Sequence, residues 1–188
     1  MDAEAEEDIR KIVNRIDRRI NGTEPERDIY PTDEALVITG DEQGLLLTSK
    51  NWGYPGIQGK GVIFNARAES VMEKKLFSEG IHHHRAIIPA KHFYEWNKNK
   101  EKNTFTRKDA DVLYMAGFYD LFDGKERFVI LTTDANESMK PVHDRMPLIL
   151  EKDQLKDWIQ EENQVKEFLK QTPVLLDRKV EYEQMTLL

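Results

Sequence analysis

Hydrophobic residues near the start of the chain recur with the period of an α-helix. The positions that would share one helical face are Ile9, Ile12, Val13, Ile16 and Ile20. Such spacing is typical of an amphipathic helix, and the acidic residues at 4, 6, 7 and 8 favour a helix N-terminus. We predict a helix over residues 3–20 that ends at Asn21-Gly22.

Short runs rich in β-branched and aromatic residues follow, and they predict strands. The first two, 35–39 and 45–48, are separated by Gly40-Asp41 and form an expected hairpin, while Asp123-Gly124 is expected to turn between two later runs. The later runs are 85–88, 92–96, 104–107, 112–119, 127–133 and 174–182.

Helical patterns surround these strands. A glycine-rich loop over 53–61 precedes a helical stretch near 69–79, and two short helices are expected at 151–160 and 163–170. Because strands outnumber helices and hairpin-length loops join several of them, we predict an α+β fold with a mainly antiparallel or mixed, barrel-like sheet and flanking helices. A length of 188 residues fits a single domain, 1–188.

Composition narrows the function classes. The sequence has no long apolar run, which excludes a transmembrane helix and a secretory signal and leads us to expect a cytoplasmic protein. It has no cysteine, which excludes disulfides and thiolate metal sites. A formal net charge of -7 argues against indiscriminate coating of nucleic acid, although a local basic groove is compatible with it.

The first polar cluster is Asn65-Ala66-Arg67-Ala68-Glu69. If the extended backbone persists to residue 69, the amide, guanidinium and carboxylate point to one side. Arginine suits bidentate binding of phosphate, and an adjacent amide can orient a hydroxyl or carbonyl. The cluster is therefore either a substrate clamp or an Arg-Glu pair on a solvated face.

The second polar cluster is Phe93-Tyr94-Glu95-Trp96. A carboxylate among aromatic residues is a candidate acid-base group, because desolvation raises its pKa. Strand alternation equally accommodates an exposed Glu95 whose aromatic neighbours face the core.

The third polar cluster is His143-Asp144-Arg145-Met146-Pro147, which follows a loop. His143 could transfer protons near neutral pH, and Arg145 could hold a phosphate. The alternative is a capping aspartate beside a surface histidine. No metal site is predicted, because the consecutive residues His82, His83 and His84 diverge in any regular structure.

These clusters occur in a definite order with Arg85, Pro89-Ala90 and Leu131-Thr132-Thr133 between them. In that order, over roughly residues 27–160, they closely resemble the SRAP family of SOS-response-associated peptidases, also called abasic-site-processing proteins. The resemblance implies a mainly β fold with a groove for single-stranded DNA that contains abasic sites. It also implies that an N-terminal cysteine condenses with the ring-opened aldehyde of the abasic site to form a stable, protective thiazolidine crosslink.

The resemblance implies roles for individual residues. Asn65 would hold the reacting N-terminus or sugar, Glu95 would transfer protons during imine formation, and His143 would assist ring opening and adduct reversal. Arg67 and Arg145 would bind phosphates. Two further DNA contacts are implied, a wedge at Pro31 and a partly structural contact at Trp52. No cofactor and no membrane partner is implied, and a monomer is expected.

Two positions depart from the family pattern. The family begins Met-Cys-Gly-Arg, whereas this sequence begins Met1-Asp2-Ala3-Glu4 and lacks the cysteine nucleophile. We interpret Met1 as an internal methionine and expect the cysteine shortly upstream. Gly56-Ile57-Gln58 stands where many relatives have a tryptophan, which removes a base-stacking ring.

Three hypotheses follow. The first is an abasic-site crosslinking protein, completed by the missing cysteine. The second, from the family's older name, is a cysteine-type peptidase or autopeptidase. The third takes the chain as it stands as a non-catalytic single-stranded DNA-binding module, in which a free α-amine could support residual abasic-site lyase activity through an imine.

Overall fold

The computed structural model describes residues 7, 10–16, 27–42 and 44–181. Residues 10–16 are helical and bury Ile12, Val13 and Ile16, as the hydrophobic period predicts. The rest of the predicted helix over 3–20 and its Asn21-Gly22 end lie largely outside the described residues. Within the described part of the chain, no helix is long and apolar enough to cross a membrane.

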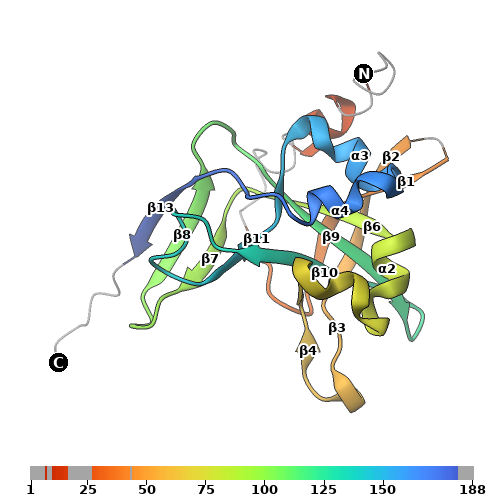
Figure 1. Ribbon diagram of the computed structural model, residues 1–188, viewed down its shortest axis with the longest axis horizontal. Helices are drawn as coiled ribbons and strands as arrows, with labels where there is room; N and C mark the ends of the chain where they lie inside the picture. Colours follow the sequence, from red (N-terminus) through yellow and green to blue (C-terminus); the bar gives the residue numbers. More distant parts are fainter. Residues whose placement is uncertain (1–6, 8–9, 17–26, 43, 182–188) are drawn as a thin grey trace.

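The main sheet has eight strands and closes on itself (Figure 1). Its path runs β11-β10-β2-β1-β6-β9-β12, and β9 also pairs with β10, so five of these strands form a barrel-like ring. The predicted mixed, barrel-like α+β fold is confirmed. The strands are β1 (Glu34–Asp41), β2 (Gly44–Trp52), β5 (Asn65–Arg67), β6 (Arg85–Ala90), β9 (Leu113–Phe122), β10 (Lys125–Asp134), β11 (Arg145–Pro147) and β12 (Ile149–Leu150).

A smaller antiparallel sheet lies to the left in Figure 1, away from most of the helices. It has the order β13-β8-β7, with β7 (Phe93–Trp96), β8 (Lys102–Arg107) and β13 (Leu176–Glu181). A short hairpin of β3 (Tyr54–Pro55) and β4 (Val62–Ile63) projects from the main body, and the 3-10 turn η1 (Ile57–Gly59) lies at its tip.

The helices are shorter than the sequence pattern predicts. The stretch predicted near 69–79 consists of two 3-10 turns, η2 (Ala68–Glu73) and η3 (Lys75–Phe77), and α-helix begins only at α2 (Ser78–His83). Extended backbone at Lys74 separates the two turns. The two predicted C-terminal helices are confirmed, each as a 3-10 turn followed by an α-helix: η4 (Lys152–Gln154) with α3 (Leu155–Gln160), and η5 (Glu162–Gln164) with α4 (Val165–Phe168).

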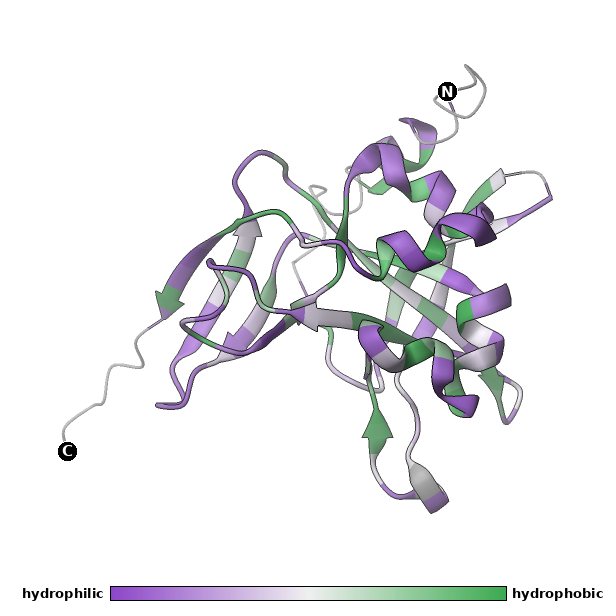
Figure 2. Cartoon of the chain, viewed as in Figure 1, coloured by the Kyte–Doolittle hydropathy of each residue, from purple (hydrophilic) through white to green (hydrophobic). Residues whose placement is uncertain are grey.

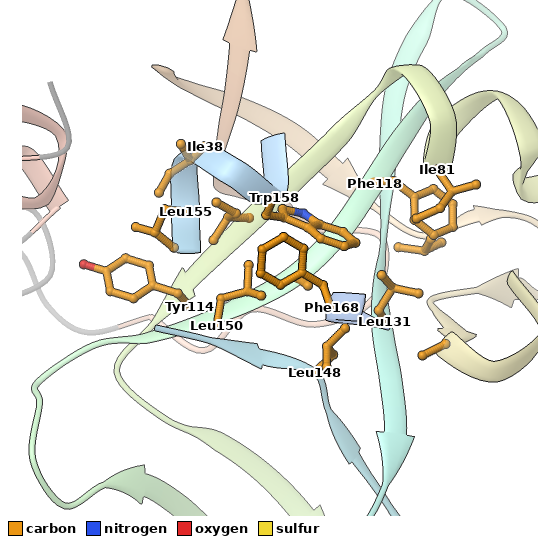
Figure 3. Packing of buried hydrophobic residues seen from close by; sticks show 14 of the residues in the cluster. Ile38, Ile81, Tyr114, Phe118, Leu131, Leu148, Leu150, Leu155, Trp158 and Phe168 are labelled. Atoms are coloured by element: carbon orange, nitrogen blue, oxygen red, sulfur yellow. The ribbon is translucent and has the colours of Figure 1, made fainter. Parts of the chain in front are cut away.

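Two hydrophobic clusters hold these layers together. The first lies between the helices and the main sheet, where Trp158 and Phe168 pack edge-to-face at 5.9 Å (Figure 3). The hydrophilic residues of α3 and α4 lie on their outward turns (Figure 2). The second cluster joins the smaller sheet to the main sheet through Phe93, Phe105 and Phe128. The polar clusters border this second core.

Arg85 of β6 ties α2 and α3 to the sheet. Its guanidinium is nearly fully buried and donates to the carbonyl oxygens of Ile81 and His82 in α2 and of Trp158 and Ile159 in α3. It also pairs with Glu162 at 2.6 Å. The last carbonyls of a helix lack intrahelical donors, so one side chain satisfies two helix ends.

Candidate functional site

The first polar cluster lies where strand β5 passes into η2. Asn65 and Arg67 are exposed on one side of β5, and Ala66 between them is buried. The strand pairs in parallel with β10, opposite Ile130 to Thr132. The expectation that extended backbone continues to residue 69 is wrong: the chain turns into η2 after Arg67, which buries Ala68 and places Glu69 in the first turn.

Glu69 is paired with Arg145 of the third cluster. The two side chains form a bidentate ion pair with N···O distances of 2.9 and 2.8 Å. Arg145 also donates to Asp134 at 2.6 Å and to the carbonyl oxygen of Thr132 at 2.7 Å. The hydrogen bonds from Arg145 lower the pKa of Glu69. Arg145 is thus held by three partners, whereas within the described residues the Arg67 guanidinium has no hydrogen bond or ion pair.

Glu95 and His143 bring the second and third clusters together. Glu95 is half-buried on β7, on the same side of the strand as Phe93, whose ring stacks on Phe105 at 5.2 Å. Burial raises the pKa of Glu95, and the charge of His143 opposes that rise.

His143 lies at the end of the loop before β11, and the backbone fixes its ring. The backbone N–H of Arg145 donates to His143 Nδ1 at 3.0 Å, so the proton of the neutral imidazole is on Nε2. Asp144 Oδ1 lies 3.2 Å from the same Nδ1, where it can accept a hydrogen bond only from the imidazolium form. The His143 side chain is 43% exposed.

Trp52 and Pro31 lie beside the first cluster. Trp52 Nε1 donates to the carbonyl oxygen of Phe64, the residue before Asn65, at 3.0 Å. The Trp52 ring stacks on Phe128 and meets the Phe64 ring edge-on. The residue after Pro31, Thr32, donates its backbone N–H to the Trp52 carbonyl oxygen at 2.7 Å. The packing of the Trp52 ring on Phe128 and Phe64 gives Trp52 a partly structural role. Direct DNA contacts of Pro31 and Trp52 remain predictions.

The sequence reasoning missed a contact that completes the site. Tyr94 Oη donates to Asp28 Oδ1 at 2.9 Å, which joins the second cluster to the loop of Pro31. Hydrogen bonds thus run from that loop to Trp52 and from Trp52 to the residue before β5, an ion pair joins Glu69 to Arg145, and the charge of His143 acts on Glu95 of β7. We call these linked groups the contact ring. Strand alternation could have placed Tyr94 opposite Glu95, but no sequence signal pointed to Asp28.

The described residues of the polar clusters do not form a metal-binding arrangement. Across the described residues, no group of three or more histidine, aspartate and glutamate side chains is arranged to hold a metal ion. Of the three consecutive histidines, His82 is paired with Glu162 at 2.7 Å and lies with α2 rather than with the polar clusters.

The pair of Glu69 and Arg145 predicts a pH dependence of stability. Because the folded-state pKa of Glu69 is lowered, its contribution is present above the ordinary glutamate pKa of about 4.3 and is lost as the pH falls towards the lowered value. We expect Glu69→Gln to reduce the urea midpoint at pH 7 and to flatten its decline between pH 5 and about 3. The exposed Glu79→Gln is the control, and an unchanged pH profile in Glu69→Gln would contradict the pairing.

Comparison with known proteins identifies the family. The model of the family "SOS response associated peptidase (SRAP)" matches residues 2–187. The abasic site processing protein YoaM of Bacillus subtilis (strain 168) is 32% identical over 160 residues, which cover 78% of this chain and 70% of YoaM. The abasic site processing protein YedK of Escherichia coli (strain K12) is 30% identical over 147 residues, which cover 74% and 66% of the two chains.

A solved structure has the same fold. The crystal structure of a protein from Bacteroides thetaiotaomicron matches with a TM-score of 0.72 and 25% identity, over 96% of this chain and 89% of that one. The crystal structure of a phage-related protein from Bordetella bronchiseptica matches with a TM-score of 0.71 and 21% identity, over 89% of each chain. With its motifs, its fold and the family model in agreement, the chain belongs to the SRAP family.

Proposed function

We propose that this protein binds abasic sites in single-stranded DNA as part of the DNA damage response. The contact ring carries the proposal: the pair of Glu69 and Arg145 joins the first and third polar clusters, and the charge of His143 in the third acts on Glu95 in the second. The names of the relatives YoaM and YedK support the substrate class.

We further propose that, with an N-terminal cysteine, the same site forms a thiazolidine crosslink. The α-amine adds to the C1′ aldehyde of the ring-opened sugar, and loss of one water from the resulting carbinolamine gives an imine. The thiol then adds to the imine carbon and its proton passes to the nitrogen, which closes the ring. A protonated Glu95 is suited to donate the proton that the departing hydroxyl needs, and Asn65 is suited to hold the amine or the sugar.

A gel assay tests this proposal. A chain preceded by Met-Cys-Gly-Arg, from which the initiator methionine has been removed so that the cysteine has a free α-amine, is incubated with single-stranded DNA that contains one abasic site. The same extension with serine in place of cysteine, processed in the same way, is the matched control. We expect a heat-stable adduct with the cysteine form alone. If neither form binds abasic DNA, the binding proposal fails, and binding without an adduct rejects the crosslinking step.

The same assay, applied to the chain without the added residues, distinguishes residual lyase activity from simple DNA binding. Borohydride reduces an imine to a stable amine, so a borohydride-trapped adduct together with strand cleavage would indicate the lyase route. Reversible, salt-sensitive binding without either product would indicate the DNA-binding module.

Arg67 is expected to supply a phosphate contact. Its guanidinium is exposed and free of ion pairs among the described residues, whereas Arg145 is neutralised by Glu69 and Asp134. We expect Arg67→Ala to reduce the slope of log affinity against log salt by about 0.7, the value for one phosphate contact on a single strand. Exposed Lys98 on the β7–β8 turn gives the control variant Lys98→Ala. An unchanged slope in Arg67→Ala would exclude the contact.

A further inference from the structure

Tyr94, a member of the second polar cluster, is the centre of a hydrogen-bonded chain that has no part in the proposed chemical steps. Its hydroxyl lies 2.9 Å from Asp28 Oδ1 and 2.8 Å from His92 Nε2. A phenol has one proton, and a carboxylate can only accept, so that proton goes to Asp28. His92 Nε2 must then carry a proton of its own and donate it to the Tyr94 oxygen. The three groups form a directed chain from His92 through Tyr94 to Asp28.

The surroundings of Tyr94 keep this chain intact. The ammonium group of Lys102 lies 3.6 Å from the centre of the Tyr94 ring, a cation–π geometry, and also 3.7 Å from Glu181. Burial, followed by the hydrogen bond to Asp28, raises the pKa of Tyr94 to about 12. The hydroxyl therefore remains a donor throughout the physiological pH range.

The loop that Asp28 belongs to is anchored at two places, on two different sheets. At its far end, Thr32 donates its backbone N–H to Trp52 of β2, and Trp52 donates back to the carbonyl oxygen of Asp33 at 2.8 Å. At its near end, residues 27–30 are exposed, and Tyr94 is the partner that connects them to β7. Residues 27–33 therefore bridge the main sheet and the smaller sheet, with Pro31 between the anchors.

Tyr94 is also the neighbour of Glu95 on the same strand. Successive side chains of a strand point to opposite faces, so Tyr94 holds the loop from the face of β7 opposite to that of Glu95. Without the Tyr94 hydroxyl, the hydrogen bond between β7 and the 27–33 loop is lost. The distance between Pro31 in that loop and Glu95 on β7 is then no longer held by this contact.

We propose that Tyr94 is a positioning residue for DNA binding, whose hydroxyl latches the 27–33 loop to the strand that carries Glu95. This inference rests on the proposed function, because the latch matters for activity only if the site binds DNA. Tyr94 touches no reacting atom; it acts through Asp28 and the loop.

Binding assays with three variants test the latch. We expect Tyr94→Phe and Asp28→Ala each to weaken binding to abasic single-stranded DNA by about three- to tenfold, the effect of one hydrogen bond. We expect the double variant to bind no more weakly than either single one, because both remove the same contact. Asp28→Asn, which keeps an acceptor oxygen, is expected to bind nearly as the unmodified chain does. Tyr119→Phe, which removes a phenol hydroxyl from β9, is the matched control.

Trypsin provides a readout that needs no DNA. Arg27, directly before Asp28, has a side chain that is 74% exposed, and release of the latch is expected to speed cleavage after it severalfold in Tyr94→Phe and Asp28→Ala. Mass spectrometry follows the fragment that begins at Asp28. An unmodified chain that fails to bind DNA overturns the proposed function. If that chain binds, unchanged affinity in both single variants overturns the latch, as does additive weakening in the double variant.

Discussion

Replacing Glu95 by glutamine in a chain that carries an N-terminal cysteine is expected to slow crosslink formation about 10²- to 10⁴-fold, the usual contribution of a positioned acid-base group. Glutamine keeps the size and polarity of the side chain but cannot release a proton to the departing hydroxyl of the carbinolamine. Single-turnover measurement of the adduct over time gives the rate.

The pH profile of the same reaction gives a second criterion. Glu95 acts as an acid while protonated, and burial raises its pKa, so the protonated form persists to higher pH than for an exposed glutamate. The rate is expected to fall as the pH rises through that raised value, and this limb is expected to vanish in Glu95→Gln. Exposed Glu34→Gln on β1 is the control. A Glu95→Gln rate equal to that of the control would remove Glu95 from the chemistry.

The second large effect is on stability. Replacing Arg85 by methionine is expected to lower the free energy of unfolding by about 3–5 kcal/mol, because the carbonyl groups at the ends of α2 and α3 lose their buried donor and Glu162 loses its partner. For a chain of this length, the melting temperature is expected to fall by about 10 °C. Methionine retains most of the side-chain volume, so cavity formation contributes little.

A matched variant separates this effect from simple loss of charge. Arg27 is exposed and, among the residues that the structure describes, pairs with Asp33 alone, at 3.4 Å, so Arg27→Met is expected to change the unfolding free energy by less than about 0.5 kcal/mol. Urea denaturation of both variants measures the difference. Equal stability of the two would show that the helix-end hydrogen bonds of Arg85 contribute nothing measurable.

Local sequence signals predicted the longer strands and the two hairpins, but Gly40 and Asp41 belong to β1 rather than to the turn, and the short strands β3, β11 and β12 were not predicted. Asp123 and Gly124 both have positive φ angles, 50° and 74°, as a two-residue hairpin turn requires. The closure of the barrel was not specified by any such signal. It depends on β9 pairing with both β6 and β10, and on β10 pairing in parallel with β2 and β5. These are contacts between distant segments, and alternation of residues does not encode the partner of a strand.

In the candidate site, too, the local sequence marked individual residues but not the distant partners that they contact. The residue types and order of the clusters marked Asn65, Glu95 and His143, but the partner of Arg145 had to be seen in the fold. Glu69 meets Arg145 across 76 residues of sequence, and Asp28 meets Tyr94 across 66. Pairing of polar side chains over such separations is determined by the packing of the sheets, which the local pattern leaves open.

The contact ring has a consequence for the lifetime of the protein. Its members come from the loop at 27–33 and from β2, β5, β7 and β11, so the contact ring exists only when the main sheet and the smaller sheet are both assembled. A ligand that binds only the folded chain adds about 2.7 kcal/mol to the unfolding free energy at a concentration one hundred times its dissociation constant. On the proposed function, damaged single strands would therefore act as a folding partner and protect the protein from proteolysis while the lesion persists.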